Sequence, residues 1–113
     1  MQESRTESRL LCADLVQVEW RLSDGEIQRE DASLEDISVS GACLQLESAI
    51  PVGAIVRIIY GKGELIGSVR YCSYRDIGYF AGIRFNPTSK WSSRVYRPMH
   101  LLNPYRPQDH IES

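Results

Sequence analysis

The sequence has no long apolar run and no large excess of charge of either sign. No stretch approaches the length needed to cross a bilayer, and the N-terminal segment MQESRTESRLLCAD lacks the apolar core of a signal peptide. The formal net charge is −2, which gives no general attraction to DNA, RNA or an anionic membrane. We therefore expect a cytoplasmic protein in which any anionic ligand binds at a local cluster of basic residues.

Cysteine and histidine are also scarce. Cys12, Cys43 and Cys72 form no CxxC pair, and each lies within apolar sequence, so we interpret them as core thiols in a reducing compartment. His100 and His110 lie in a proline-containing tail, with no nucleophile motif and no metal-ligand spacing around them. The sequence therefore predicts a protein that is not an enzyme, with no catalytic residue, no metal site and no cofactor.

What remains is the composition of an ordinary soluble domain. The chain has 113 residues, 42% of them apolar and 25% charged, which suits a single domain with one hydrophobic core. The basic residues are arginines apart from Lys62 and Lys90. Arginine offers planar, bidentate recognition that lysine cannot provide.

Alternating apolar residues and regularly spaced turn residues predict an all-β chain. No helical periodicity occurs before residue 87, and the loop Asp31-Ala32-Ser33 is expected to separate two short strands. Six or seven short strands at this spacing favour a small antiparallel barrel, whose closure removes exposed edges. The expected strands are 10–20, 26–30, 34–38, 42–47, 54–60, 64–74 and 79–85.

The C-terminal part differs in pattern from the rest. A short helix is expected over 88–97, with Thr88 or Ser89 as its N-cap and Pro98 ending it, before an irregular tail. The predicted organisation is an N-terminal arm at 1–9, a barrel at 10–86 and a short helix with a tail at 87–113.

Two polar motifs stand out from this background. Arg5 and Arg9 lie four residues apart, just ahead of the first expected strand. Asp36, Ser38 and Gly41 form a DxSxxG pattern between two expected strands. Taken alone, the first is typical of a solvated basic tail, and the second of a loop whose side chains bond to nearby backbone.

Together the two motifs resemble the PilZ domain. The resemblance extends from Arg5 to Phe85 and includes Ala81-Gly82-Ile83-Arg84-Phe85 in the last expected strand. It implies a six-stranded antiparallel barrel from a bacterial protein that binds the second messenger cyclic di-GMP. Because Ser4 precedes Arg5, where many relatives have a basic or bulky residue, one ligand molecule and a stacked pair both remain open.

The resemblance also implies roles for the motif residues. The guanidinium groups of Arg5 and Arg9 would pair with guanine O6 and N7, stack on a base or bind phosphate. The Asp36 carboxylate would accept hydrogen bonds from guanine N1–H and N2–H2, and the Ser38 hydroxyl could serve either partner. Gly41 would allow close backbone approach. Additional candidate ligand-binding residues are Ser40, Arg84 and Arg70, although the sequence favours a plain surface role for both strand arginines.

The expected function is that of a receptor and adaptor. Cyclic di-GMP would order a mobile arm formed by residues 1–9 and so change the surface offered to a protein partner of unknown identity. The alternative is a PilZ-like protein-interaction module that does not bind nucleotide. A barrel that binds DNA or RNA is disfavoured by the net charge of −2.

Overall fold

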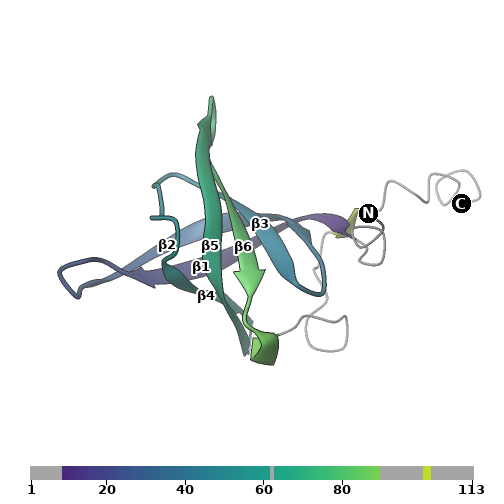
Figure 1. The fold of residues 1–113 in the computed structure, drawn as a ribbon. Helices are drawn as coiled ribbons and strands as arrows, with labels where there is room; N and C mark the ends of the chain where they lie inside the picture. The colour runs from purple at the N-terminus through teal and green to yellow at the C-terminus, as the bar shows by residue number, and fades with distance from the viewer. Residues whose placement is uncertain (1–8, 62, 90–100, 103–113) are drawn as a thin grey trace, which may run out of the picture.

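The structure is a computed structural model that describes residues 9–61 and 63–89 and the backbone of 101–102. Six long strands form its body, and two smaller elements follow them (Figure 1). The strands are β1 (Leu10–Arg21), β2 (Ile27–Ile37), β3 (Gly41–Leu46), β4 (Ile55–Tyr60), β5 (Gly63–Arg75) and β6 (Gly78–Phe85). The smaller elements are the 3-10 helix η2 (Pro87–Ser89) and the short strand β7 (Leu101–Leu102).

The six long strands close into an antiparallel barrel. Their order is β2-β3-β6-β5-β4-β1, and β1 also pairs with β2, so the sheet returns to its first strand. β1 contacts β4 through residues 17–20, while β7 pairs with the start of β1 at Leu11 and Cys12. The six-stranded antiparallel barrel that the sequence predicts is therefore confirmed.

Alternation along each strand builds the core. In β1, for example, Cys12, Val16 and Val18 face the interior, and the residues between them on the outer face are mostly exposed. Fully burying an aliphatic side chain contributes about 1.5–3 kcal/mol, so the interior stabilises the barrel without a bound group. The largest fully buried apolar side chains are Val18, Leu34, Ile37, Leu44, Ile50, Val56, Ile58, Leu65 and Val69.

The predicted loop at Asp31-Ala32-Ser33 is wrong. β2 continues through these residues, which pair with Gln17, Val16 and Leu15 of β1. Ala32 is buried and Asp31 is exposed. The small and polar residues therefore satisfy the inside-outside alternation of a strand, and pairing with β1 overrides their preference for turns.

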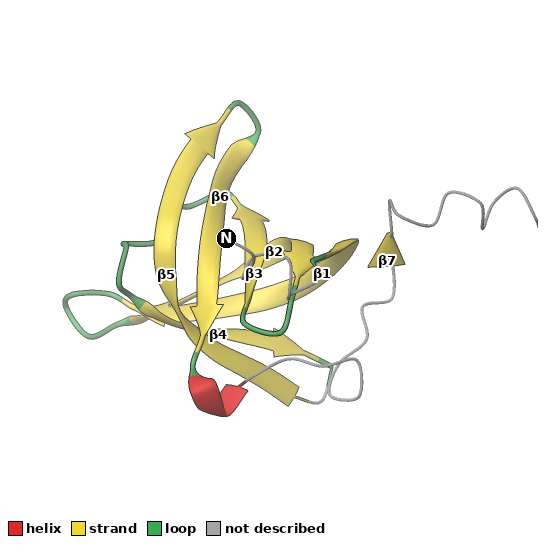
Figure 2. Cartoon of the chain, turned by 45° about the vertical axis from the view of Figure 1, so that its right-hand side comes forward, coloured by secondary structure: helices red, strands yellow, loops and turns green. Residues whose placement is uncertain are grey.

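The C-terminal region is described only in part. Pro87–Ser89 forms one turn of 3-10 helix immediately after β6 (Figure 2). Most of the predicted helix at 88–97, with its terminator Pro98, lies outside the described residues, as do Arg5 and the rest of the arm ahead of Arg9.

Three strands carry β-bulges. The register shifts between Leu11 and Asp14 in β1, between Leu34 and Asp36 in β2, and between Val69 and Tyr71 in β5. A bulge adds one residue to one strand and redirects the side chains beside it. The bulges in β2 and β5 determine which side chains reach the outer face discussed next.

Candidate functional site

The DxSxxG motif forms the hairpin that joins β2 to β3. Ile37 pairs with Ala42, and the Ser38 N–H donates to the Gly41 carbonyl at 2.8 Å, which leaves Val39 and Ser40 at the tip. The Ser40 carbonyl accepts a hydrogen bond from the Phe85 N–H at 2.7 Å. The hairpin is therefore held against the end of β6.

Arg9 and Asp36 are in direct contact. Arg9 lies immediately before β1, Asp36 lies in β2 beside the bulge, and an Arg9 guanidinium nitrogen donates to Asp36 Oδ1 across a separation of 27 residues in the sequence. The Arg9 side chain is 58% exposed and that of Asp36 is 20% exposed. The structure thus brings together one described residue from each predicted motif.

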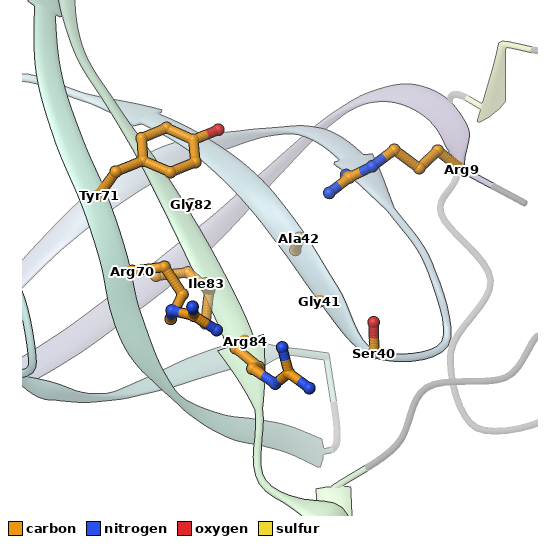
Figure 3. Close-up of a pocket in the computed structure, with 9 residues that line it drawn as sticks. All are labelled: Arg9, Ser40, Gly41, Ala42, Arg70, Tyr71, Gly82, Ile83 and Arg84. Carbon is orange, nitrogen blue, oxygen red and sulfur yellow. The ribbon is translucent and has the colours of Figure 1, made fainter. Parts of the chain in front are cut away.

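A shallow hollow of about 180 Å³ lies beside this ion pair on the outside of the barrel (Figure 3). It lies over β3, β5 and β6. Three guanidinium groups surround it, because Arg9 reaches in from one side while Arg70 and Arg84 extend from β5 and β6. The lining is completed by Ser40, Gly41, Ala42, Tyr71, Gly82 and Ile83.

The hollow is positively charged in a protein whose net charge is −2. The hydrogen bond to Asp36 raises the pKa of Arg9 further, against a smaller opposing effect of burial. Burial raises the pKa of the Tyr71 phenol, so this hydroxyl remains a neutral donor at physiological pH. Enclosed ligand pockets are typically about 300–1,000 Å³, so a nucleotide held here would lie across the surface.

Gly41 is required by the packing of the barrel. A Cβ at this position would overlap the carbonyl oxygen of Ile83 in the neighbouring strand β6. Gly41 pairs with Arg84 and is buried in β3. Its lack of a side chain therefore lets β3 and β6 approach one another, and direct contact with a ligand stays a prediction.

Ser38 lies beneath the turn. Its relative exposure is 1%, and its hydroxyl lies 3.4 Å from the Gly41 carbonyl, to which it donates. Ser38 does not line the hollow, whereas Ser40 and Arg84 do. Ser38 therefore supports the turn, and its contact with a ligand also stays a prediction.

Tyr71 was not among the residues that the sequence indicated. Leu65, Gly67 and Val69 alternate toward the interior, a pattern that would turn Tyr71 inward as well. The bulge after Val69 leaves Arg70 and Tyr71 exposed one after the other. Nothing in the local sequence signals this shift, because it depends on the pairing of β5 with β6.

Cys43 faces outward, so its interpretation as a core thiol is wrong. It pairs with Asp36 on one side and with Gly82 on the other, and its sulfur accepts a hydrogen bond from the Tyr71 hydroxyl at 3.9 Å. Cys12 is buried, Cys72 is partly buried against the core, and all three thiols are free. Burial raises the pKa of Cys43, which disfavours a reactive thiolate.

The described residues include neither a candidate metal site nor a membrane-spanning helix. Within 9–61 and 63–89, no group of three or more His, Cys, Asp or Glu side chains is arranged to hold a metal ion. No helix in the described part of the chain is long and apolar enough to span a membrane.

Comparison with known proteins adds a structural likeness. No family model matches the sequence, and no curated protein matches it. Among solved structures, the barrel is similar to the PilZ domain, with c-di-GMP, of YcgR from Escherichia coli, at a TM-score of 0.54 and 20% sequence identity. The match covers 77% of this chain and 83% of the other.

The chain has a PilZ-type fold. This confirms the resemblance drawn from the sequence as far as the architecture is concerned. In this PilZ-type barrel, the motif residues Arg9 and Asp36 meet on the outer face, beside the hollow lined by Arg70 and Arg84.

Proposed function

We propose that this PilZ-type barrel is a receptor for cyclic di-GMP, without catalytic activity, and that the ligand lies across the outer hollow. The contact between Arg9 and Asp36 is the observation that carries the proposal, since it joins the two polar motifs at one place. The likeness to a PilZ domain that holds c-di-GMP supports the same ligand class.

The chemistry of the pair suits a guanine base. The Asp36 carboxylate can accept hydrogen bonds from guanine N1–H and N2–H2, and a guanidinium group can donate to guanine O6 and N7 or to phosphate. In the free protein Arg9 occupies an oxygen of Asp36. We propose that the guanine edge takes this place and that Arg9 moves onto the ligand.

The energies allow such an exchange. A solvent-exposed ion pair contributes about 0.2–1 kcal/mol, and the Arg9 side chain is 58% exposed. A good bidentate arginine contact to guanine discriminates by about 1–3 kcal/mol. The contact with the ligand therefore outweighs the ion pair that it replaces.

Arg70 and Arg84 give the hollow further positive charge. Both are exposed on neighbouring strands, and no acidic side chain lines the hollow beside them among the described residues. Cyclic di-GMP has two phosphates, and guanidinium groups bind phosphate oxygens through charge-assisted hydrogen bonds. We assign these two arginines to the phosphates, and Arg5, which lies outside the described residues, stays a predicted contact.

A signalling role follows from the exchange at Asp36. Arg9 joins the barrel to the segment that precedes it, so moving its side chain changes the surface at the N-terminal side of the site. We propose that a protein partner recognises this changed surface. The alternative function, an interaction module that does not bind nucleotide, predicts that the partner binds regardless of cyclic di-GMP.

Calorimetric titration with cyclic di-GMP tests the proposal. We expect saturable binding by the wild-type protein, and much weaker binding of cyclic di-AMP, because adenine offers Asp36 no N1–H donor. Arg9→Ala and Asp36→Ala should each weaken binding by about tenfold or more. Arg21→Ala is the matched control, since it removes one positive charge at the distant β1–β2 turn, where Arg21 donates to the Gly25 carbonyl.

A folded wild-type protein that takes up no cyclic di-GMP would reject the receptor proposal and favour the interaction module. Equal affinities for Arg9→Ala, Arg21→Ala and wild type would place the ligand elsewhere on the barrel.

A further inference from the structure

Tyr71 is placed on the outer face by the β-bulge in β5. Val69 pairs with Ile83 and Tyr71 pairs with Gly82, so Arg70 is the extra residue of a bulge in β5. Regular alternation would direct Tyr71 into the core behind Val69. Bulges of this kind are over-represented next to functional sites, where they redirect a side chain.

The ring of Tyr71 lies directly on Gly82. A Cβ at Gly82 would overlap three atoms of the ring, so the strand backbone and the ring are in contact. The hydroxyl group then reaches across β6 to the sulfur of Cys43 in β3, at 3.9 Å. One face of the ring therefore rests on β6, and the hydroxyl fixes its direction.

The exposed side of the ring belongs to the hollow. Tyr71 is 48% exposed and lines the hollow with Arg9 and Arg84 (Figure 3). The strand pairing places Asp36, Cys43, Gly82 and Tyr71 in one row across four neighbouring strands. Because the ring extends along this row toward Cys43, its open face and the Asp36 carboxylate border the same surface.

We propose that Tyr71 is a stacking platform for a guanine of the ligand, with Gly82 and Cys43 as positioning residues that hold the ring flat. The inference rests on the proposed function and adds a second recognition element to it. Asp36 reads the edge of a base, and Tyr71 supports its face. Aromatic side chains bind bases in this way because every base has a π-face.

Substitutions at position 71 distinguish stacking on a base from a purely structural role, in which the side chain only covers Gly82. Tyr71→Ala should weaken cyclic di-GMP binding by roughly 5- to 150-fold, the range for loss of one base–aromatic stack. Tyr71→Phe keeps the ring and should bind within about threefold of wild type, since only the hydrogen bond to Cys43 is lost. Tyr71→Leu keeps an apolar cover over Gly82 without a π-face and should behave like Tyr71→Ala.

A substitution at Gly82 tests independently whether ligand binding requires the Tyr71 ring to lie on β6. Gly82→Ala leaves Tyr71 present but forces its ring off β6, so we expect a loss of affinity that Tyr71→Ala does not increase in the double variant. Tyr74→Ala is the matched control, because Tyr74 is 63% exposed on the same strand and does not line the hollow. Its affinity should equal that of wild type.

A readout on the ligand distinguishes stacking from indirect effects. In the NMR spectrum of bound cyclic di-GMP, a guanine H8 proton should shift upfield with Tyr71 or Tyr71→Phe and lose this shift with Tyr71→Leu. Circular dichroism checks that each variant is folded.

The possible failures differ from one another. If the wild-type protein binds but Tyr71→Leu binds equally well, the platform is rejected and the receptor proposal survives. If the wild-type protein does not bind cyclic di-GMP, both are rejected.

Discussion

The exchange of partners at Asp36 makes a quantitative prediction for a double-mutant cycle. In the free protein Arg9 contacts Asp36, and in the proposed complex each residue contacts the ligand instead. Arg9→Ala removes a ligand contact of about 2 kcal/mol. It also removes an ion pair of about 0.5 kcal/mol that the free wild-type protein must break on binding.

The net loss for Arg9→Ala is therefore about 1.5 kcal/mol, slightly more than tenfold in affinity. The same reasoning gives a similar loss for Asp36→Ala. The double variant loses both ligand contacts. The cost of breaking the ion pair, about 0.5 kcal/mol, is saved only once, because there is a single pair. Its expected loss is about 3.5 kcal/mol, roughly 350-fold, whereas strict additivity predicts roughly 150-fold.

Calorimetric titrations of the four proteins at low ionic strength measure this difference, because salt weakens the exposed pair. A double-mutant cycle of urea unfolding experiments on the same four proteins measures the free energy of the ion pair independently. Its coupling energy of about 0.5 kcal/mol should equal the excess loss in the binding cycle. A double variant that binds better than additivity predicts would refute the exchange, because it would mean that Arg9 and Asp36 remain paired in the complex.

Two further predictions concern Gly41 and Cys12. Gly41→Ala should lower the free energy of unfolding in urea by about 1–3 kcal/mol, because the new Cβ overlaps backbone, and should also weaken ligand binding. Gly25→Ala, with φ +94° and open space around it, should lose stability but keep affinity, so equal affinities for the two would contradict a role for Gly41 in the site. Burial raises the pKa of Cys12 from 9.0 to about 12, so the folded protein retains a proton that the unfolded chain releases, and stability should fall as pH rises across that range. Cys12→Ala should flatten this part of the curve of unfolding free energy against pH, and an unchanged slope would show that Cys12 does not cause it.

Much of the fold was predictable because a barrel imposes inside-outside alternation on every strand. Ser23-Asp24-Gly25 consists of residue types that favour turns, and it lies in the turn between β1 and β2, where Gly25 has a positive φ of +94°. The error at Asp31-Ala32-Ser33 has a physical cause. These residues favour turns by their local chemistry, but ten backbone pairings with β1 hold β2 in one extended strand.

The site was predictable to the extent that it depends on motifs. Arg9 and Asp36 were expected to lie together, and the structure brings them into contact. Tyr71 could not be assigned from the sequence, because its outward direction arises from a register shift between β5 and β6. A register shift is a property of two paired strands and leaves no trace in the periodicity of one.

The position of the site on a closed barrel limits how a bound ligand could act. Asp36, Tyr71 and Arg84 belong to strands that are hydrogen-bonded on both sides, so their backbones have little freedom to move. Arg9 lies outside this ladder, just before β1, and its link to the hairpin is a side-chain ion pair. A ligand that takes Asp36 from Arg9 would therefore change the molecule most at the N-terminal side of the site and least within the barrel. Amide exchange with and without cyclic di-GMP should accordingly differ near Arg9 and the β2–β3 hairpin, with the core strands β4 and β5 unchanged away from the hollow.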